Sequence, residues 1–366
     1  MPSKNKVFIV DDRLPYLFDD INYPVGGATV QAFAWFHGFS EKFDVTILSN
    51  SKKNFTSDDI NVIQYPRTGG SPFGLIRAIR MLNKTIKKEK PEIVFVTVAG
   101  LNAFIWGILT LFNKLYYIQR ISNDIVYEKN VYRKKIGFIK NFLSRIGIRH
   151  AKLVLVQNDY QYKNLNGIVP SENILKVHNP YKSKYTTINP EEEDERSYIG
   201  WVGLFQYQKN LPALFEIAQQ CPNLNFRIAG KDSAKVDSET LGYIQKLKEL
   251  PNVAFVGMLD RKEIINFFSK AKCLLNTSHY EGFSNTYLEA FSVGTPVVTR
   301  SKTDPDDIIK NNQLGLVAKD YSELPNLLQK INSQKLNESH IIQYLEKFHN
   351  PVNMVEALER KFNSTK

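Results

Sequence analysis

Two glutamates in the second half of the chain could bind the hydroxyl groups of one extended ligand. Glu281 follows the apolar run Lys272–Asn276 and precedes a predicted helix, and Glu289 lies inside that helix. Carboxylates accept hydrogen bonds from vicinal hydroxyls, as the acidic residue of ribose-binding Rossmann sites does. Gly282 lets the backbone pass close to a ligand, and Ser284 is expected to cap the helix and leave its first N–H groups free for a diphosphate. On spacing alone, the commoner arrangement is a loop and helix with two solvated glutamates.

The longer string around these glutamates resembles a known family signature. Residues 281–298 resemble the E-x7-E signature of the family 4 (group 1) retaining glycosyltransferases, written E-G-F-x-N-x-x-L-E-A-x-x-x-G-x-P-V-V. The resemblance implies that Glu281 contacts the transferred sugar and that Glu289 binds the ribose of a nucleoside-diphosphate sugar. It also implies that the backbone of Phe283, Ser284, Asn285 and Thr286 holds the sugar and the diphosphate. The matching residues are Glu281, Gly282, Phe283, Asn285, Leu288, Glu289, Ala290, Gly294, Pro296, Val297 and Val298.

Two further segments of the second half resemble the same family. Gly203 and Lys209 match its G-R-x-x-x-x-K loop, in which the lysine would offset the charge that builds on the departing diphosphate. Leu204 stands where the family has its arginine, so the phosphate charge must be met by Lys209 or from elsewhere. Residues 252–259 resemble the strand and turn whose backbone reads the base near Met258 and Leu259. Taken alone, Lys209 would be an ordinary surface lysine.

The first half matches the family more loosely. Gly27 belongs to a Gly-Gly turn that resembles the glycine-rich loop beneath the donor phosphates. Where many relatives carry a histidine facing the sugar, this chain has Arg120 and Asp124, a pattern that a subset of the family shares. We expect Arg120 or Asp124 to face the acceptor, and a salt bridge at the end of a strand is the equally weighted alternative.

Short apolar runs alternate with helical patterns along the whole chain, which predicts doubly wound α/β sheets, two in succession. The resemblance implies the GT-B type, in which two Rossmann-like domains face across a cleft. We expect an acceptor-binding domain over 1–190, a nucleotide-sugar-binding domain over 197–345 and a helix over 350–366 that returns to the first domain. The acidic segment 189–196 is predicted to be a solvated linker or surface loop at the domain boundary. Strands are predicted at 7–10, 45–48, 93–98, 116–118, 153–156, 199–202, 225–228, 253–256, 272–276 and 296–299.

The net charge of +11 is unevenly distributed. Residues 1–150 hold 22 Lys+Arg and 12 Asp+Glu, a net of +10, and the remainder is almost neutral. A basic amphipathic helix is predicted over 132–149, with Ile139 and Phe142 among its apolar residues and Lys140 among its cations. It is suited to an anionic membrane surface, and the alternative is a surface helix that packs its apolar stripe on its own core. The basic residues match no nucleic-acid-binding signature.

Cysteine content and hydropathy limit the other classes of protein to which the chain could belong. The two cysteines, Cys221 and Cys273, lie far apart and suggest neither a disulfide framework nor a metal site. The longest apolar stretch, 101–112, is too short to span a bilayer, and no export signal is evident, so we expect a cytoplasmic protein, free or peripheral on the inner face of the membrane.

The resemblance implies metal independence, with the nucleotide sugar as co-substrate, no other cofactor, and a glycan or glycolipid as acceptor. Two rival interpretations remain. One is a catalytically silent homologue that binds a nucleotide sugar or a partner transferase. The other is a dinucleotide-dependent oxidoreductase, which the absence of a G-x-G-x-x-G turn after the first strand disfavours.

Overall fold

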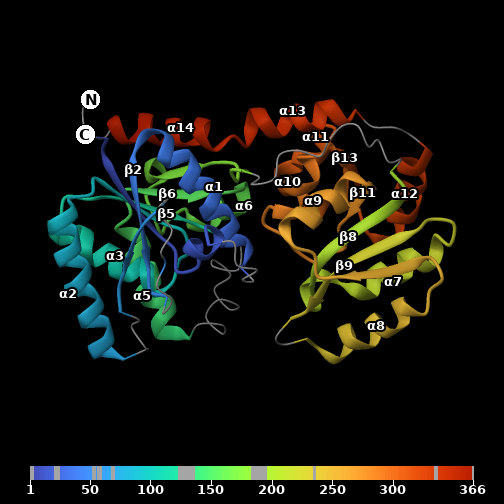
Figure 1. Ribbon diagram of the computed structural model, residues 1–366, viewed down its shortest axis with the longest axis horizontal. Coiled ribbons are helices and arrows are strands. Elements are labelled where there is room, and N and C mark those ends of the chain that lie inside the picture. Colours follow the sequence, from blue (N-terminus) through green and yellow to red (C-terminus); the bar gives the residue numbers. More distant parts are fainter. Residues whose placement is uncertain are drawn as a thin grey trace. The chain divides into compact units, whose positions relative to one another are not determined.

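The chain forms two compact units, each built on one parallel sheet (Figure 1). The computed structural model describes residues 4–19, 25–51, 55, 60–66, 71–122, 137–182, 196–233, 236–333 and 337–364. The first unit comprises residues 1–182 and 349–366, and the second comprises residues 183–348. The predicted α/β class with two Rossmann-like sheets is confirmed.

The first sheet has seven strands in the order β3-β2-β1-β4-β5-β6-β7, all parallel. Its central strands are short apolar runs that are buried on both faces, as helix-covered parallel strands require. Chain order reverses between β1 and β4, and ligands of such sheets bind at the carboxyl ends of strands near this reversal. The strands are β1 Lys6–Val10, β2 Asp44–Ser49, β3 Asn61–Gln64, β4 Ile93–Val96, β5 Tyr116–Arg120, β6 Leu153–Val156 and β7 Ile174–Lys176.

Helices cover both faces of this sheet. Because successive strand residues point to opposite faces, Phe8 packs under one helical layer and Ile9 under the other. The layer over Phe8 comprises α2 Pro72–Glu89, α3 Leu101–Phe112 and α5 Phe138–Arg149. The opposite layer comprises α1 Gly27–Lys42 and α14 Pro351–Asn363, which pack against each other. The short helix α6 Asp159–Leu165 follows β6.

The second sheet has six parallel strands in the order β10-β9-β8-β11-β12-β13, and its reversal lies between β8 and β11. The strands are β8 Tyr198–Phe205, β9 Phe226–Asp232, β10 Val253–Gly257, β11 Ala271–Leu275, β12 Val297–Arg300 and β13 Gly315–Ala318. The α-helices of this unit are α7 Leu211–Gln220, α8 Ser238–Lys248, α9 Arg261–Ser269, α10 Asn285–Phe291, α11 Ile308–Asn311, α12 Leu324–Ser333 and α13 Glu338–Phe348.

The observed strands include three that the sequence did not indicate. The ten predicted strands are present with ends shifted by up to four residues, and β3, β7 and β13 are additional. Each of the three occupies a sheet edge, and none is fully buried along its length. An edge strand pairs on one side only, so its sequence does not need the continuous apolar run that signals a central strand.

The basic helix predicted over 132–149 begins at Phe138 in the described part of the chain, as α5. Small residues form its contact with α3, because Gly147 lies against the backbone of Ala103 and of Gly107. Three of its large apolar side chains remain exposed, with Phe138 at 62%, Ile139 at 70% and Phe142 at 57%. These three side chains do not pack on the core of the unit, whereas Ile148 of the same helix is buried in it.

Most of the predicted linker 189–196 lies outside the described residues, and its last residue differs from the expectation. Arg196 is not solvated, because its guanidinium pairs with Glu338 at 3.0 Å. It also donates to the carbonyl oxygens of Ala271 at 2.8 Å and of Val293 at 2.7 Å. Arg196 therefore ties the start of α13 to the sheet. Within the described ranges, no helix has the length and apolar character needed to cross a membrane.

The close contact between α3 and α5 can be tested with an added methyl group. A Cβ at position 147 would lie 2.1 Å from the carbonyl oxygen of Ala103, and overpacking of this kind costs about 1–3 kcal/mol. We expect Gly147→Ala to lower the midpoint of thermal unfolding measured by calorimetry. Gly242→Ala in α8 is the matched control, because nothing lies within 4 Å of its Cβ and such a change stabilises an exposed helix by about 0.4–1 kcal/mol. Equal midpoints for the two variants would contradict the packing described.

Candidate functional site

Two loops meet at the carboxyl ends of β8 and β11, the neighbouring strands at the reversal of the second sheet. The first loop follows β8 and contains the short 3-10 helix Tyr207–Lys209. The second follows β11 and runs through residues 276–284 to the start of α10. Sheets of this kind bind ligands at such a point, so the topology itself singles out these loops.

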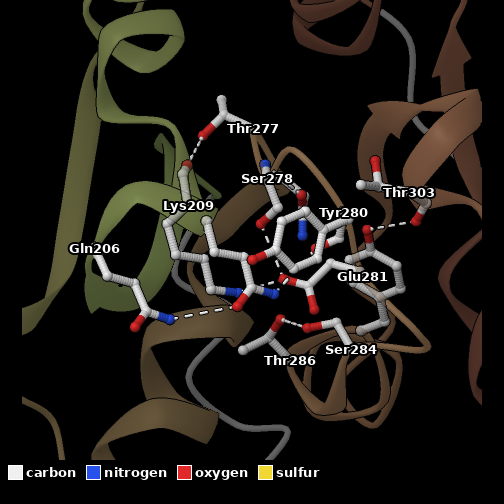
Figure 2. Close-up of polar contacts among 12 residues, drawn as sticks. Gln206, Lys209, Thr277, Ser278, Tyr280, Glu281, Ser284, Thr286 and Thr303 are labelled. Atoms are coloured by element: carbon white, nitrogen blue, oxygen red, sulfur yellow. Dashed lines mark hydrogen bonds and ion pairs between the residues drawn. The ribbon is translucent and has the colours of Figure 1, made fainter. Parts of the chain in front are cut away.

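Lys209 and Glu281 form an ion pair across the two loops (Figure 2). Lys209 Nζ lies 2.5 Å from Glu281 Oε1, and the two side chains are 15% and 11% exposed. Ser278 Oγ donates to the same carboxylate oxygen at 2.9 Å. Partial burial sets this pair apart from a surface salt bridge, because charges withdrawn from water must be neutralised by partners of good geometry. The interpretation of Lys209 as an ordinary surface lysine is therefore wrong.

Hydrogen bonds hold the two loops together around this pair. His279 N donates to the Gln208 carbonyl oxygen at 2.8 Å, and Gln208 Nε2 donates to the Tyr280 carbonyl oxygen at 3.0 Å. Thr277 links the loops to the sheet, because its hydroxyl accepts from Trp201 Nε1 and donates to the Lys209 carbonyl oxygen. The rings of Tyr207 and His279 also pack together, with centroids 4.7 Å apart.

Glycine at position 203 makes room for the lysine. A Cβ on Gly203 would lie 3.3 Å from Cδ and Cε of Lys209, a distance at which the lysine would have to move. Gly203 therefore belongs to the site through its size. Leu204, which replaces the arginine of the family pattern, is 45% exposed and lies in β8 beside this glycine.

The start of α10 agrees with the expected position and differs in its chemistry. Ser284 occupies the N-cap position, but its hydroxyl makes no capping bond to a helix N–H. It is instead hydrogen-bonded to the hydroxyl of Thr286 at 2.8 Å (Figure 2). The first turn is therefore not capped by the Ser284 side chain. Next to it, Gly282 is partly exposed, Phe283 is buried and Asn285 is partly exposed.

A buried tyrosine supports α10 from below. Tyr287 is fully buried and donates through its hydroxyl to the Thr303 carbonyl oxygen at 2.9 Å. The same hydroxyl lies 3.1 Å from Thr299 Oγ1, at the end of β12. These contacts fix the helix that carries Glu289 against the end of a neighbouring strand.

Glu289 lies on α10 in a setting that disfavours its charge. Burial raises the pKa of its carboxyl group to about 7, and the positive charge of Arg261 opposes this rise in part. At neutral pH the carboxyl group is therefore close to half ionised. A carboxylate with so few charged partners remains able to accept hydrogen bonds from ligand hydroxyls.

Met258 and Leu259 follow β10, at the same edge of the sheet as the two loops. Gly257 precedes them with a left-handed φ of +79°, which favours glycine. Met258 is 55% exposed and Leu259 is partly exposed, so both are accessible. The strand itself is largely exposed, so it is not a plain buried core strand.

The predicted residues of the first half lie in the first unit. Gly27 is the first residue of α1 and is exposed. Arg120 ends β5 and is only 2% exposed. Its Nη2 donates to Asn179 Oδ1 at 3.2 Å, and its Nη1 has no hydrogen-bond partner in the described part of the chain. Burial lowers the pKa of this guanidinium to about 10, although Asp11 acts in the opposite direction. Among the described residues Arg120 forms no salt bridge, and Asp124 lies outside them.

Two residues that the sequence did not indicate contact the second loop. Arg300 Nη2 donates to the Ser278 carbonyl oxygen at 3.0 Å, and the Tyr321 hydroxyl donates to the Thr277 carbonyl oxygen at 3.1 Å. Neither belongs to a recognisable motif. The one sequence feature that marks Arg300 is its position as a charged residue at the end of the strand Val297–Arg300.

Comparisons with known proteins identify the family. One family model, described as glycosyl transferases group 1, matches residues 186–348, and another, described as glycosyl transferase 4-like, matches residues 25–158. An uncharacterised glycosyltransferase of Methanocaldococcus jannaschii is 25% identical over 263 residues, which cover 65% of this chain and 63% of that protein. The match thus spans less than two thirds of the relative's length.

Solved structures share the fold over nearly the whole chain. The apo form of the lipopolysaccharide outer core galactosyltransferase WaaB has a TM-score of 0.70 at 17% identity, covering 99% of this chain and 100% of that one. Anabaena Alr3699/HepE in complex with UDP-glucose has a TM-score of 0.75 at 14% identity, covering 98% and 99%. The common architecture is the GT-B fold. With one family model on each unit, the chain belongs to the group 1 glycosyltransferases.

Proposed function

We propose that the protein is a retaining glycosyltransferase that moves a hexose-type sugar from a nucleoside-diphosphate sugar to a saccharide or lipid-linked acceptor of a surface glycan. The observation that carries the proposal is the Lys209–Glu281 pair, held by two loops at the reversal of the second sheet and followed directly by α10. A catalytically silent protein that only binds a nucleotide sugar is the alternative. The retained lysine and glutamates favour turnover.

Each charged group has a distinct part in the proposed complex. Glu281 accepts hydrogen bonds from hydroxyls of the transferred sugar, and Glu289 accepts them from the ribose. Lys209 lies within reach of both sugar and diphosphate, because its ammonium group already contacts Glu281. As the diphosphate departs, Lys209 stabilises the growing negative charge in a partly buried setting, where such an interaction is stronger than in water.

The proposed reaction balances without a metal ion or a separate general base. The acceptor oxygen forms a bond to the anomeric carbon on the face from which the diphosphate oxygen leaves. The acceptor proton passes to the departing phosphate oxygen, and the anomeric configuration is retained. A glycosidase mechanism fits less well, because it needs two opposed carboxyls that flank the scissile bond, whereas Glu281 and Glu289 lie on one loop and helix.

The relatives support the substrate class. The WaaB structure is that of a lipopolysaccharide outer core galactosyltransferase, and the Anabaena protein was solved with UDP-glucose. By analogy, we propose a sugar nucleotide as donor and a growing surface polysaccharide or lipid-linked oligosaccharide as acceptor.

We also propose that the first unit binds an anionic membrane from the cytoplasmic side. Helix α3 contacts both α2 and α5 (Figure 1), and the three helices carry several exposed apolar side chains. Exposed cations lie among them, and we call this set the basic-apolar face. Its apolar members are Phe73, Ile76, Met81, Leu111, Phe112, Phe138, Ile139 and Phe142, and its basic members are Arg77, Arg80, Lys84, Lys114 and Lys140.

Charge complementarity identifies the occupant of this face. Helices α3 and α5 contain no acidic residue, and the single glutamate of α2, Glu89, is paired with Lys6. A surface that combines exposed cations with exposed aromatic and aliphatic side chains matches the headgroup region of acidic lipids. A lipid-linked acceptor would be presented at the same surface.

A donor panel tests the proposed transfer. Thermal unfolding should be measured with nucleotide sugars on the wild type and on Glu289→Ala, with and without a chelator. We expect one donor to raise the unfolding midpoint of the wild type, and the rise to be smaller in the variant because the ribose loses an acceptor. The chelator should change nothing. No shift with any donor would count heavily against the proposal, and NAD binding without donor binding would favour an oxidoreductase.

The pH dependence of donor binding tests the role of Glu289. Because burial raises its pKa from 4.5 to about 7, the carboxyl group is mostly protonated below pH 7, and its contribution to folding stability is lost as the pH rises from 4.5 to 7. If the ionised form binds ribose, donor affinity should be about tenfold lower at pH 6 than at pH 8. Glu289→Gln should bind weakly and without this step. The same step in Glu289→Gln would assign it to another group.

Vesicle sedimentation tests the basic-apolar face. We expect binding to phosphatidylglycerol vesicles, weak binding to phosphatidylcholine vesicles, and loss of binding in high salt. Reversing Arg77, Arg80 and Lys84 to glutamate should lower binding by about 100-fold or more, since each cation near an acidic surface contributes about 1 kcal/mol. Reversal of Lys246, Lys248 and Lys262 in the second unit is the matched control and should have little effect. Equal losses in both variants would exclude this face as the binding surface.

A further inference from the structure

Arg300 is a buried cation, and the acidic group that its charge acts on, Asp320, is exposed and forms no salt bridge with it. Arg300 ends β12, is 6% exposed and forms no salt bridge with any residue in the described part of the chain. Its Nε is buried and has no hydrogen-bond partner among the residues that the structure describes. Burying a charge in this way is costly, and an apolar residue would fill the position with less penalty. The guanidinium at this position is therefore better explained by a function than by stability.

The contacts of Arg300 converge on the loop that precedes Glu281. Its Nη2 donates to the carbonyl oxygen of Ser278 at 3.0 Å and approaches that of His279 at 3.4 Å. The guanidinium carbon lies 3.7 Å from the centre of the Tyr321 ring, within the range of a cation–π contact. Arg300 is thus held between an aromatic ring and two backbone carbonyls.

Tyr321 holds the same loop through its hydroxyl group. The hydroxyl donates to the carbonyl oxygen of Thr277 at 3.1 Å and lies 3.4 Å from that of Ser278. The side chains of these two loop residues continue the contacts, because Thr277 Oγ1 donates to the Lys209 carbonyl oxygen and Ser278 Oγ donates to Glu281. Arg300 and Tyr321 therefore fix the backbone from which Lys209 and Glu281 are both oriented.

The positive charge of Arg300 affects the pKa of a side chain in this loop. The pKa of His279 is lowered by burial first and then by the charge of Arg300. In the family pattern an arginine is expected at position 204, where this chain has an exposed leucine. Arg300, at the end of β12, thus places a cation beside the loop that follows β11.

We propose that Arg300 and Tyr321 position the loop 277–281 for donor binding, and that the Arg300 guanidinium supplies near the diphosphate the positive charge that Leu204 lacks. The proposal rests on the proposed function, since it assigns these residues to the same donor site. Both act through the loop backbone and are positioning residues. The charge of Arg300 adds to that of Lys209 when the diphosphate leaves.

The test compares Arg300→Met, Arg300→Lys and Tyr321→Phe with the wild type, and Arg227→Met is the matched control. Arg227 makes a similar cation–π contact, with its guanidinium carbon 4.4 Å from the centre of the Tyr198 ring, but it lies on β9 and has an exposed side chain. Unfolding midpoints are measured first, and only variants that remain folded are taken further. Two readouts then separate positioning from charge.

Hydrogen exchange of the ligand-free protein reports on positioning. We expect amides of residues 277–281 to exchange about tenfold faster in Arg300→Met, the size expected when a hydrogen bond from a charged donor is lost. Tyr321→Phe should give a smaller increase in the same peptides, and Arg227→Met none. Unchanged exchange in Arg300→Met, or faster exchange spread over the whole second unit, would overturn the positioning role.

Affinity for ADP, GDP, UDP, CDP and dTDP, set against that for the matching nucleosides, reports on charge. For whichever diphosphate binds, Arg300→Met should lose about tenfold in affinity while the nucleoside changes little, and Arg300→Lys should recover part of the loss. Equal losses for nucleoside and diphosphate would overturn the charge role. If no diphosphate binds the wild type, the proposed function fails and the charge role with it, while the exchange data still decide the positioning role.

Discussion

The ion pair between Lys209 and Glu281 joins two loops that are separated by 72 residues in the sequence. It can form only because β8 and β11 are neighbours in the sheet, so that both loops leave from the same edge. Withdrawing two charges from water is unfavourable unless their geometry is good. The contacts around the pair meet that condition: Ser278 donates to the carboxylate, Thr277 ties the loops to the sheet, and the absence of a side chain at Gly203 leaves space for the lysine. The other contacts of the two loops are arranged so that this buried pair is satisfied.

Charged groups held in unfavourable settings recur at the carboxyl edges of both sheets. Arg120 and Arg300 are buried cations with incomplete hydrogen bonding, and Glu289 is a carboxyl group whose pKa burial raises to about 7. A sequence selected only for stability would replace such groups with apolar residues. In a protein of this family, Arg300 and Glu289 of the second unit are explained if a ligand rich in phosphate and hydroxyl groups binds at the carboxyl edge of that sheet. The basic-apolar face of the first unit is different, because its cations are solvated and its apolar side chains are the groups in an unfavourable setting.

The sequence predicted the central strands and the alternation of helices, because these depend on continuous apolar runs and on residues close together in the chain. The edge strands β3, β7 and β13 were missed because one-sided pairing leaves a weaker pattern. For α5 the helix was predicted, but the contact that Gly147 makes with α3 was not, because no hydrophobic pattern records a glycine. Arg300 and Tyr321 were missed for another reason: they reach the loop from β12 and from the segment after β13, and only the folded sheet brings these together. At Ser284 the N-cap position was predicted correctly, but the hydroxyl bonds to Thr286 Oγ1 and not to a helix N–H group.

Helix α14 gives the first unit a discontinuous chain. Val355, Leu358 and Phe362 of this helix are buried in the same core as Ile9 and Trp35 near the start of the sequence. Gly38 of α1 lies so close to Pro351 that a Cβ there would be 2.5 Å from its carbonyl oxygen. During synthesis, domains generally fold as units in the order in which they leave the ribosome. Here the unit that is made first lacks part of its core until the whole second unit has been translated. The apolar layer formed by α1 must therefore stay uncovered, or covered by another protein, for most of the time that the chain is being made.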